Sequence, residues 1–410
     1  MAVRHGYGKI AGADALVFAY DTGDTRNSYK GEPTTNLWDS MLNTQSLRTH
    51  TKHYWDGKKW TEDATYSHPG VEGPRGTYLG VVFKHISGAL NSSWSGTSYG
   101  YMLRDIACTN GATMTMSSWI YASTDCDVDA IPAVIEGESG GESSVAGYPS
   151  TYDLTNKGSW QQTAKKATSD GNTRFIPLYP RKGGVTDGSF AGFFMWALPQ
   201  VTYGDHVVQP IQPGTTRSAT EGLKDLTGNY SINLANTGFD SNAQPVFDGT
   251  NDHMDVGTGI LSGTGDFTVE AVVQSDYQEV NGTIFANYPA GNFQTFFSGR
   301  FIGLFLANSS TYLGTAPFTV VLPEYTTDPI HFVAQREGTT TRLYLNGVLK
   351  KTGSSSSTIG STSTAFRVGA NTSGTEDFLG DIFVVKAYNR ALTAAEVKNN
   401  YNNYKGRFGI

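Results

Sequence analysis

Hydrophobic positions along the chain gather in short segments that are bounded by Gly, Asn, Asp or Ser. Within several of them apolar and polar residues alternate, which places successive side chains on opposite faces of a strand. Short segments of this kind are typical of antiparallel strands in a β-sandwich. The predicted strands are Leu79 to Phe83, Thr113 to Tyr121, Phe190 to Trp196, Phe267 to Val273, His331 to Ala334, Arg342 to Leu345 and Leu379 to Tyr388.

The segment 393–404, TAAEVKNNYNNY, departs from this pattern because Ala, Val and Tyr recur in it at helical intervals. Thr393 can cap the first turn, and Glu396 follows at the spacing of a capping box. A chain of 410 residues is too long for a single hydrophobic core. We therefore predict an all-β protein with two jelly-roll β-sandwich domains and one short C-terminal helix.

Two polar segments interrupt the strand pattern. Residues 209–221 combine two prolines with small polar residues, and we predict a linker there. The low-complexity segment 354–364 lies between two predicted strands and indicates an exposed hairpin loop. The Asn-Gly pair in LYLNGVL is a strong turn signal, so this stretch should form one hairpin with Leu343 and Leu345 facing the core.

Composition narrows the class of protein. The chain has 48 Gly, 22 Tyr and 21 Phe but only 16% charged residues, a mixture that suits short strands joined by Gly-rich turns. Its net charge of −7 is not concentrated in a block, which argues against nucleic acid as a partner. We find no stretch that predicts a secretion signal or membrane insertion, so we expect a soluble protein. Two cysteines, Cys108 and Cys126, are too few for a disulfide framework, and whether they pair stays open.

From Phe247 the sequence reads FDGTNDHMDVGTG, then DFTVEAVV, then IHFVAQREGTTTRLYLNGVLKKTG, and then FRVGANTSGTEDFLGDIFVVKAYNRALTAAEVKNNYN. These segments, in this order, resemble the laminin-G-like, concanavalin A-like jelly roll. The ending YNRALTAAEVKNNYNNYKGRFGI resembles the terminal signature of such modules in structural proteins of tailed bacteriophages. The resemblance therefore implies a phage virion protein.

The first half of the chain resembles a carbohydrate-binding-module-like β-sandwich of phage tail proteins. The segments that carry this resemblance are residues 110–123, 158–173 and 189–218. Residues 16–31 resemble the opening strand of a laminin-G-like module, whose continuation follows only at Gly222. We therefore predict that residues 1–31 and 222–410 form the laminin-G-like domain, and that residues 32–215 are inserted into it.

Aromatic residues outside the apolar strands are the candidates for sugar binding, because β-sandwiches hold sugars by stacking exposed rings on them. The alternative role for each is packing within its own domain or against a neighbouring subunit. By contrast, Trp119 and Trp196 lie within apolar strands and are assigned to the core. The candidate carbohydrate-binding residues are Trp55, Trp60, Trp94, Tyr288 and Phe293.

Two acidic motifs are candidates for a calcium site. Asp248 and Asp252 lie in FDGTND, and Asp377 and Asp381 lie in TEDFLGD. Carboxylates supply the hard oxygen ligands that calcium prefers. The alternative is that these residues only cap tight turns, and nothing in the sequence requires a cofactor.

Catalytic motifs are weak. A glycoside hydrolase needs two carboxylates flanking the scissile bond. The best local matches are Glu136, Glu138 and Glu142 in a Gly-rich segment that indicates a loop, and Asp276 with Glu279. The eight histidines are scattered along the chain, so no nucleophilic triad is indicated either. We therefore predict that the protein is not an enzyme.

The resemblance implies a non-enzymatic virion structural protein, in a tail fibre, beside a spike or on the capsid surface, that mediates glycan adhesion or particle assembly. Its expected partners are other virion proteins, a host cell-surface glycan and further copies of the chain. The protein would be made in the host bacterial cytoplasm and displayed on the particle surface. Two alternatives stay open, a capsid decoration or cement protein without sugar binding and a polysaccharide-cleaving glycoside hydrolase. The glycan, the host, the copy number and the choice between head and tail are left open as well.

Overall fold

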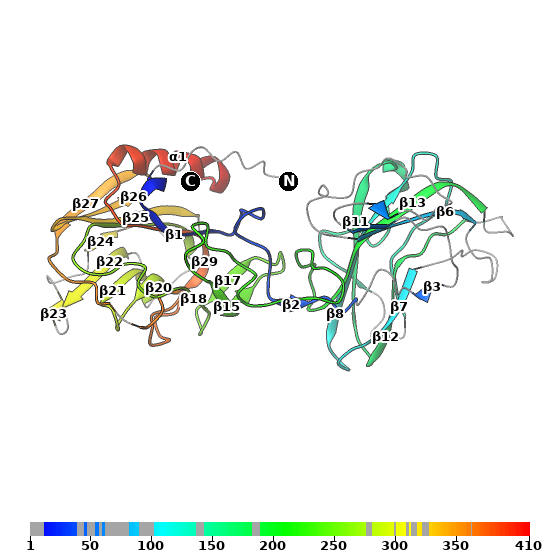
Figure 1. Ribbon diagram of the computed structural model, residues 1–410, viewed down its shortest axis with the longest axis horizontal. Helices are drawn as coiled ribbons and strands as arrows, with labels where there is room; N and C mark the ends of the chain where they lie inside the picture. Colours follow the sequence, from blue (N-terminus) through cyan, green and yellow to red (C-terminus); the bar gives the residue numbers. More distant parts are fainter. Residues whose placement is uncertain are drawn as a thin grey trace. The chain divides into compact units, whose positions relative to one another are not determined.

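The chain folds into two compact units, which are described here from a computed structural model (Figure 1). Unit 1 comprises Met1–Pro33, Ser218–Asp240 and Gln244–Ile410, and unit 2 comprises Thr34–Arg217 with Ser241–Ala243. Strands dominate both units, which confirms the all-β prediction. The structure describes residues 12–38, 45–46, 54–56, 60–61, 82–89, 102–136, 143–182, 189–275, 281–298, 301–308, 311–312, 318–321, 328–361 and 363–410.

Unit 1 is a sandwich of two antiparallel sheets. The first sheet contains β1 (Leu16–Asp21), β16 (Gly238–Phe239), β17 (Pro245–Asp248), β19 (Phe267–Ser275), β25 (Ile330–Glu337), β26 (Thr340–Leu345), β27 (Val348–Ser354) and β29 (Leu379–Tyr388). The second contains β15 (Asn233–Asn236), β18 (His253–Asp255), β20 (Asn281–Asn287), β21 (Phe293–Ser298), β22 (Phe301–Asn308), β23 (Thr311–Tyr312), β24 (Phe318–Val321) and β28 (Arg367–Val368).

Strand β19 of the first sheet is covered on both of its faces. Val269, Ala271 and Val273 point into the core between the sheets. Val272, on the opposite face, packs against Tyr404 of the C-terminal helix α1 (Ala394–Phe408). Because both faces of the strand are covered, its first seven residues are all buried, and these include the polar Thr268 and Glu270.

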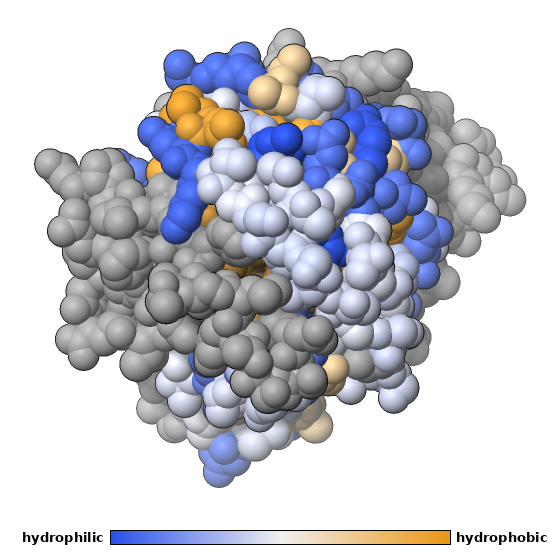
Figure 2. All heavy atoms as spheres, turned by 90° about the vertical axis from the view of Figure 1, so that its left-hand side faces the viewer, coloured by the Kyte–Doolittle hydropathy of each residue, from blue (hydrophilic) through white to orange (hydrophobic). Residues whose placement is uncertain are grey.

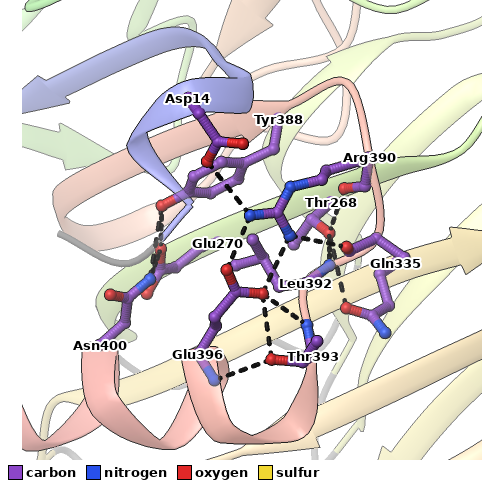
Figure 3. Close-up of polar contacts among 11 residues, drawn as sticks. Asp14, Thr268, Glu270, Gln335, Tyr388, Arg390, Leu392, Thr393, Glu396 and Asn400 are labelled. Carbon is purple, nitrogen blue, oxygen red and sulfur yellow. Dashed lines mark hydrogen bonds and ion pairs between the residues drawn. The ribbon is translucent and has the colours of Figure 1, made fainter.

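Helix α1 begins with the predicted capping box (Figure 3). The Thr393 hydroxyl accepts a hydrogen bond from the Glu396 amide at 3.2 Å, and the Glu396 carboxylate accepts one from the Thr393 amide at 2.8 Å. The helix runs past the predicted end at Tyr404, because Gly409 provides the left-handed C-cap only after Phe408. The residues that the structure describes also include two short 3-10 turns, Ala13–Ala15 in unit 1 and Leu154–Asn156 in unit 2. Within the described ranges, no helix has both the length and the apolar character needed to cross a membrane.

The N-terminal strand β1 belongs to unit 1. It pairs antiparallel with β29, with Phe18 opposite Ala387. The chain therefore starts unit 1, passes through unit 2 and resumes unit 1 at Ser218. The predicted linker 209–221 is not a separate segment, because the division between the units falls within it and its residues up to Arg217 belong to unit 2.

Unit 2 also contains two antiparallel sheets. The larger contains β4 (Tyr54–Asp56), β5 (Trp60–Thr61), β6 (Val82–Ala89), β8 (Thr113–Ala122), β10 (Ser143–Ser144), β11 (Trp160–Thr168) and β13 (Ser189–Tyr203). The smaller contains β3 (Gln45–Ser46), β7 (Met102–Ala107), β9 (Val134–Glu136) and β12 (Asn172–Leu178). A two-stranded ribbon, β2 (Thr34–Thr35) with β14 (Thr216–Arg217), joins the two ends of the unit. Both cysteines are free thiols.

The prediction of an exposed loop at 354–364 holds for only part of that segment. Ser355, Ser357 and Ile359 are buried, and each alternates with an exposed residue. Arg336 explains this arrangement, because its buried guanidinium group donates to backbone carbonyls that include that of Ser357. Alternate residues of this polar, low-complexity segment therefore cover a charged group, while the residues between them remain exposed.

The β26–β27 hairpin forms as predicted, with Leu343 and Leu345 in the core. β27 is the edge strand of its sheet and carries Val348 and Leu349, which are 48% and 47% exposed. Figure 2, which faces the β27 side of unit 1, shows a small hydrophobic patch near its upper edge among hydrophilic residues. Two lysines follow in the strand, and charged side chains of this kind oppose edge-to-edge pairing.

Candidate binding site

Aromatic and polar side chains meet on the outward face of the second sheet of unit 1. On β21, Phe293 and Phe297 point into the core, so Gln294 between them points to the opposite face. On β22 the residues on either side of Phe305 belong to the core, which turns the Phe305 ring outward. Gln294 and Phe305 are cross-strand partners, so an amide and an aromatic ring lie side by side on this face.

Tyr288 adds a second ring. Its centroid lies 4.9 Å from that of Phe305 and the planes meet at 76°, a T-shaped contact. Both rings are half-buried. The backbone carbonyl of Tyr288 accepts hydrogen bonds from the Thr372 amide at 2.6 Å and from the Thr372 hydroxyl at 2.7 Å. These contacts fix the turn that carries Tyr288 to the loop that begins at Asn371.

Glu376 completes the polar side of the arrangement. Its Oε2 accepts from Gln294 Nε2 at 2.7 Å and from Asn371 Nδ2 at 3.1 Å. The same Gln294 nitrogen donates to the Thr283 hydroxyl at 2.7 Å. The side-chain amides of Gln294 and Asn371 are therefore each held in one orientation, so their positions do not depend on a ligand.

The backbone of Glu376 lies in the left-handed region, with φ of 59°. For a residue with a Cβ this conformation costs roughly 1 to 2 kcal/mol. The hydrogen bonds from Gln294 and Asn371 offset that cost. Strained backbone that the surrounding structure holds in place is more frequent at functional sites than elsewhere.

We call these five residues, Tyr288, Gln294, Phe305, Asn371 and Glu376, the Tyr288 site. Aromatic rings provide flat apolar surface, and the carboxylate of Glu376 provides acceptors. Gln294 and Asn371 are buried, and their side-chain amides donate within the protein and hold Glu376 in place. Residues 373–375, in the adjoining loop, are exposed. The site thus combines the two kinds of group that a polyhydroxylated ligand with apolar faces requires.

Only Tyr288 among the predicted sugar-binding residues belongs to this site. Phe293 is fully buried against Phe267 and Phe366, so its ring offers no surface to a sugar, and that prediction is wrong. Trp55 and Trp60 are cross-strand partners on β4 and β5, but their side chains lie outside what the structure describes.

Trp94 lies outside the described residues altogether. Sequence reasoning missed Gln294, Phe305 and Glu376. The alternation in FQTFFS and FIGLFLAN separates the first two from their buried neighbours, but no local signal points to Glu376.

The acidic motifs form turns. Asp248 accepts from the Thr250 amide at 2.7 Å, and Asp252 accepts from the Asp248 amide at 3.0 Å. Burial raises the pKa of Asp252. Asp381 lies on β29, and Asp377 precedes that strand. In the part of the chain that the structure describes, no three His, Cys, Asp or Glu side chains form a group that could hold a metal.

A second polar cluster lies under α1 (Figure 3). The fully buried Glu270 carboxylate accepts from His331 at 2.8 Å, from the Tyr388 hydroxyl at 2.8 Å and from Asn400 at 3.1 Å, and Lys386 lies 3.9 Å away. Burial alone would raise the pKa of Glu270, but the Lys386 ammonium and His331 lower it to about 2. Because Glu270 and His331 have no exposed surface, we interpret this cluster as a structural anchor for the helix.

The hydrolase alternative rests on residues that the structure describes only in part. Glu136 ends strand β9, whereas its side chain and all of Glu138 lie outside the described residues. The second glutamate of a dyad therefore has no described position.

Comparisons with known proteins agree with the architecture of unit 1. Residues 248–398 match a family model described as the concanavalin A-like lectin/glucanases superfamily. Unit 1 is thus a concanavalin A-like jelly roll, and the Tyr288 site lies entirely within the matched residues. Among curated proteins, none matches the chain.

The solved structures that the chain matches include binding domains. Domain 4 of the extracellular arabinanase AbnA from Geobacillus stearothermophilus, solved in complex with arabinotriose, is 18% identical, with a TM-score of 0.34 over 45% of this chain and 93% of that one. The binding domain of Paraclostridial mosquitocidal protein 1 is 13% identical, with a TM-score of 0.35 over 44% of this chain and 49% of that one. The receptor-binding domain of botulinum neurotoxin D is 12% identical, with a TM-score of 0.36 over 45% of this chain and 51% of that one. The aligned part of the chain spans about half the length of the last two proteins.

Proposed function

We propose that this protein is a non-enzymatic, glycan-binding structural protein of a bacteriophage particle, and that the Tyr288 site holds the sugar. The observation that carries the proposal is the T-shaped ring pair of Tyr288 and Phe305 beside the hydrogen-bonded Gln294 and Glu376. Sugar rings present an apolar face and a rim of hydroxyls, and this pairing matches both.

The carboxylate of Glu376 is better suited to binding a sugar than to hydrolysing a glycosidic bond. Glu376 accepts hydrogen bonds from two amide groups, so both of these contacts use the carboxylate as an acceptor. Glycoside hydrolysis requires a second carboxyl group that donates a proton across the scissile bond. The five residues of the Tyr288 site include one carboxylate.

The virion assignment is supported by the ending of the sequence, residues 388–410, which resembles that of phage structural modules. These residues include α1 with its capping box, which covers a face of the first sheet. The expected partners are other virion proteins, copies of the chain and a host cell-surface glycan. The expected location is the particle surface, after synthesis in the host bacterial cytoplasm.

Glycan binding is tested by probing an array of bacterial capsular and lipopolysaccharide glycans with the intact chain and with Tyr288→Ala. Loss of the ring should weaken binding to the recognised glycan by about tenfold, the worth of one aromatic contact. Tyr203→Ala is the matched control, because Tyr203 is 42% exposed and lies in unit 2. If Tyr288→Ala binds the glycan as tightly as the intact chain does, the Tyr288 site does not hold the sugar. Release of reducing ends from the glycan would favour the glycoside hydrolase alternative.

The virion assignment is tested by cryo-electron microscopy of purified particles labelled with an antibody against this chain. Label at the tail tip or on fibres would support an adhesin. Regular label across the capsid lattice, together with no glycan binding, would favour the decoration or cement protein. Absence of the chain from particles would overturn the assignment.

A further inference from the structure

Three side chains of the cluster under α1 are buried together and differ in their chemistry. They are the Lys386 amine, the Glu270 carboxylate and the Asn400 amide, and these residues are only 3%, 0% and 1% exposed. Val269 and Ala387 point into the core from the same two strands, so Glu270 and Lys386 point to the opposite face, which α1 covers. Asn400 reaches the Glu270 carboxylate from α1 (Figure 3).

Strand pairing brings the amine to the carboxylate. Glu270 and Lys386 are cross-strand partners on β19 and β29, and Lys386 Nζ lies 3.9 Å from Glu270 Oε2. The same oxygen accepts a hydrogen bond from Asn400 Nδ2 at 3.1 Å. Glu270 Oε2 therefore lies between the amine nitrogen of a lysine and the amide nitrogen of an asparagine.

Neighbouring side chains hold these groups in place. His331 Nε2 and the Tyr388 hydroxyl each form a hydrogen bond of 2.8 Å with the Glu270 carboxylate. Lys386 Nζ lies 4.8 Å from the centroid of the Tyr404 ring, and Tyr404 follows Asn400 by one turn of α1. The amine therefore lies against the face of α1 that carries Asn400.

The environment of Lys386 favours a neutral amine. Among the lysines that the structure describes, only Lys386 is buried. Its 3.9 Å contact with Glu270 is longer than a hydrogen bond, so an ammonium group recovers little of the hydration that it loses. Burial accordingly lowers the pKa of Lys386. A neutral lysine amine is a nucleophile, and the nearest carboxamide that the cluster offers is that of Asn400.

We propose that Lys386 and Asn400 become joined by an intramolecular isopeptide bond, and that Glu270 catalyses the reaction. The Lys386 Nζ lone pair attacks Cγ of Asn400, a new Nζ–Cγ bond replaces the Cγ–Nδ2 bond, and Nδ2 leaves as ammonia. Glu270 Oε2 takes one proton from Nζ and delivers it to Nδ2, so the carboxylate is regenerated. The reaction exchanges one amide for another and needs no oxidant.

The bond would tie α1 covalently to the sheet that it covers. It closes a ring through residues 386–400, which contain the end of β29, the turn after it and the start of α1. Because β29 also pairs with β1, the bond would fix the final helix to the place where the first and last segments of unit 1 meet. This proposal does not depend on glycan binding.

Mass spectrometry of the full-length chain tests the bond directly. Loss of one ammonia lowers the intact mass by about 17 Da. Trypsin should no longer cleave after Lys386, and the digest should contain residues 368–390 joined to residues 399–405. Lys386→Arg and Asn400→Ala should each have the mass calculated from their sequence and lack the joined peptide. Lys351→Arg, which changes an exposed lysine on β27, is the matched control and should retain it.

The joined peptide decides between the outcomes. If the unaltered chain yields residues 368–386 and 399–405 only as separate peptides, the proposal is overturned, whether or not any variant folds. A deficit of about 17 Da that persists in Lys386→Arg also overturns it, because an asparagine that cyclises elsewhere loses ammonia too. Glu270→Gln keeps the shape of the side chain and should slow the appearance of the joined peptide by roughly a hundredfold. Joining at an unchanged rate in that variant would remove the catalytic role of Glu270.

Discussion

Arg407 in the last turn of α1 forms a two-pronged ion pair with Asp21 at the end of β1. The two side chains are only 14% and 4% exposed, although 386 residues separate them in sequence. The pair joins the first strand of unit 1 to its final helix. Both ends of the described chain thus belong to one unit, and unit 2 is inserted between them.

Removing the Arg407 side chain should destabilise unit 1. Arg407→Ala leaves the carboxylate of Asp21 buried without its partner, which should lower the free energy of unfolding by about 2 to 3 kcal/mol. Differential scanning calorimetry, with hydrogen exchange of β1 and β29, would measure the loss. The exposed Lys350→Ala is the control. Asp21→Asn should be measured alone and together with Arg407→Ala. If the double mutant loses as much free energy of unfolding as the two single variants together, the two residues are not coupled.

Unit 1 should lose stability in acid through Glu270. Its folded-state pKa of about 2 lies below the ordinary value of 4.5, so its contribution is present above pH 4.5 and is lost as the pH falls toward 2. Glu396, whose pKa Arg390 also lowers to about 2, acts in the same direction. Calorimetry at pH 6, 4.5 and 3 should show the unit 1 transition moving down, while tryptophan fluorescence follows unit 2 separately. A unit 1 transition that stays constant over this range would contradict the prediction.

Gly347→Ala should weaken the β26–β27 hairpin. Gly347 has φ of 74°, and an added Cβ would lie 2.9 Å from Lys398 Cδ and 3.0 Å from Tyr401 Cβ. We expect a loss of about 2 kcal/mol in the free energy of unfolding of unit 1, from backbone strain together with crowding against α1. Gly338→Ala is a matched control, because its φ of 58° is comparable and no atom lies within 4 Å. If Gly347→Ala and Gly338→Ala lose the same free energy of unfolding, crowding of the added Cβ against α1 makes no contribution.

Thr393→Ala should remove the capping box of α1. The change deletes the acceptor for the Glu396 amide and should cost about 1 kcal/mol. Thr393→Ser keeps the hydroxyl and should cost much less. Hydrogen exchange in the first turn of the helix distinguishes the two variants, and equal protection in both would count against the cap.

Local patterns predicted the elements that depend on nearby residues. The strand Leu379–Tyr388 has the predicted bounds, the capping box forms, and the Asn-Gly hairpin places Leu343 and Leu345 in the core. Alternation, caps and turn residues act over a few positions, so one chain segment contains the whole signal. The prediction for 354–364 failed at Ser355, Ser357 and Ile359, because the burial of this segment depends on Arg336, which lies on a different strand.

The same distinction holds for the candidate sites. The sequence by itself determined an all-β chain, the positions of many strands, the C-terminal helix and the candidacy of Tyr288. Tertiary structure decided that Phe293 is buried while Phe305 faces outward, and that Trp119 lies outside the core of unit 2. Alternation divides a strand into two faces but does not say what covers each face. Only folding brings Gln294 to Glu376, 82 residues away, and Glu270 to Asn400, because strand pairing and the packing of α1 set those contacts.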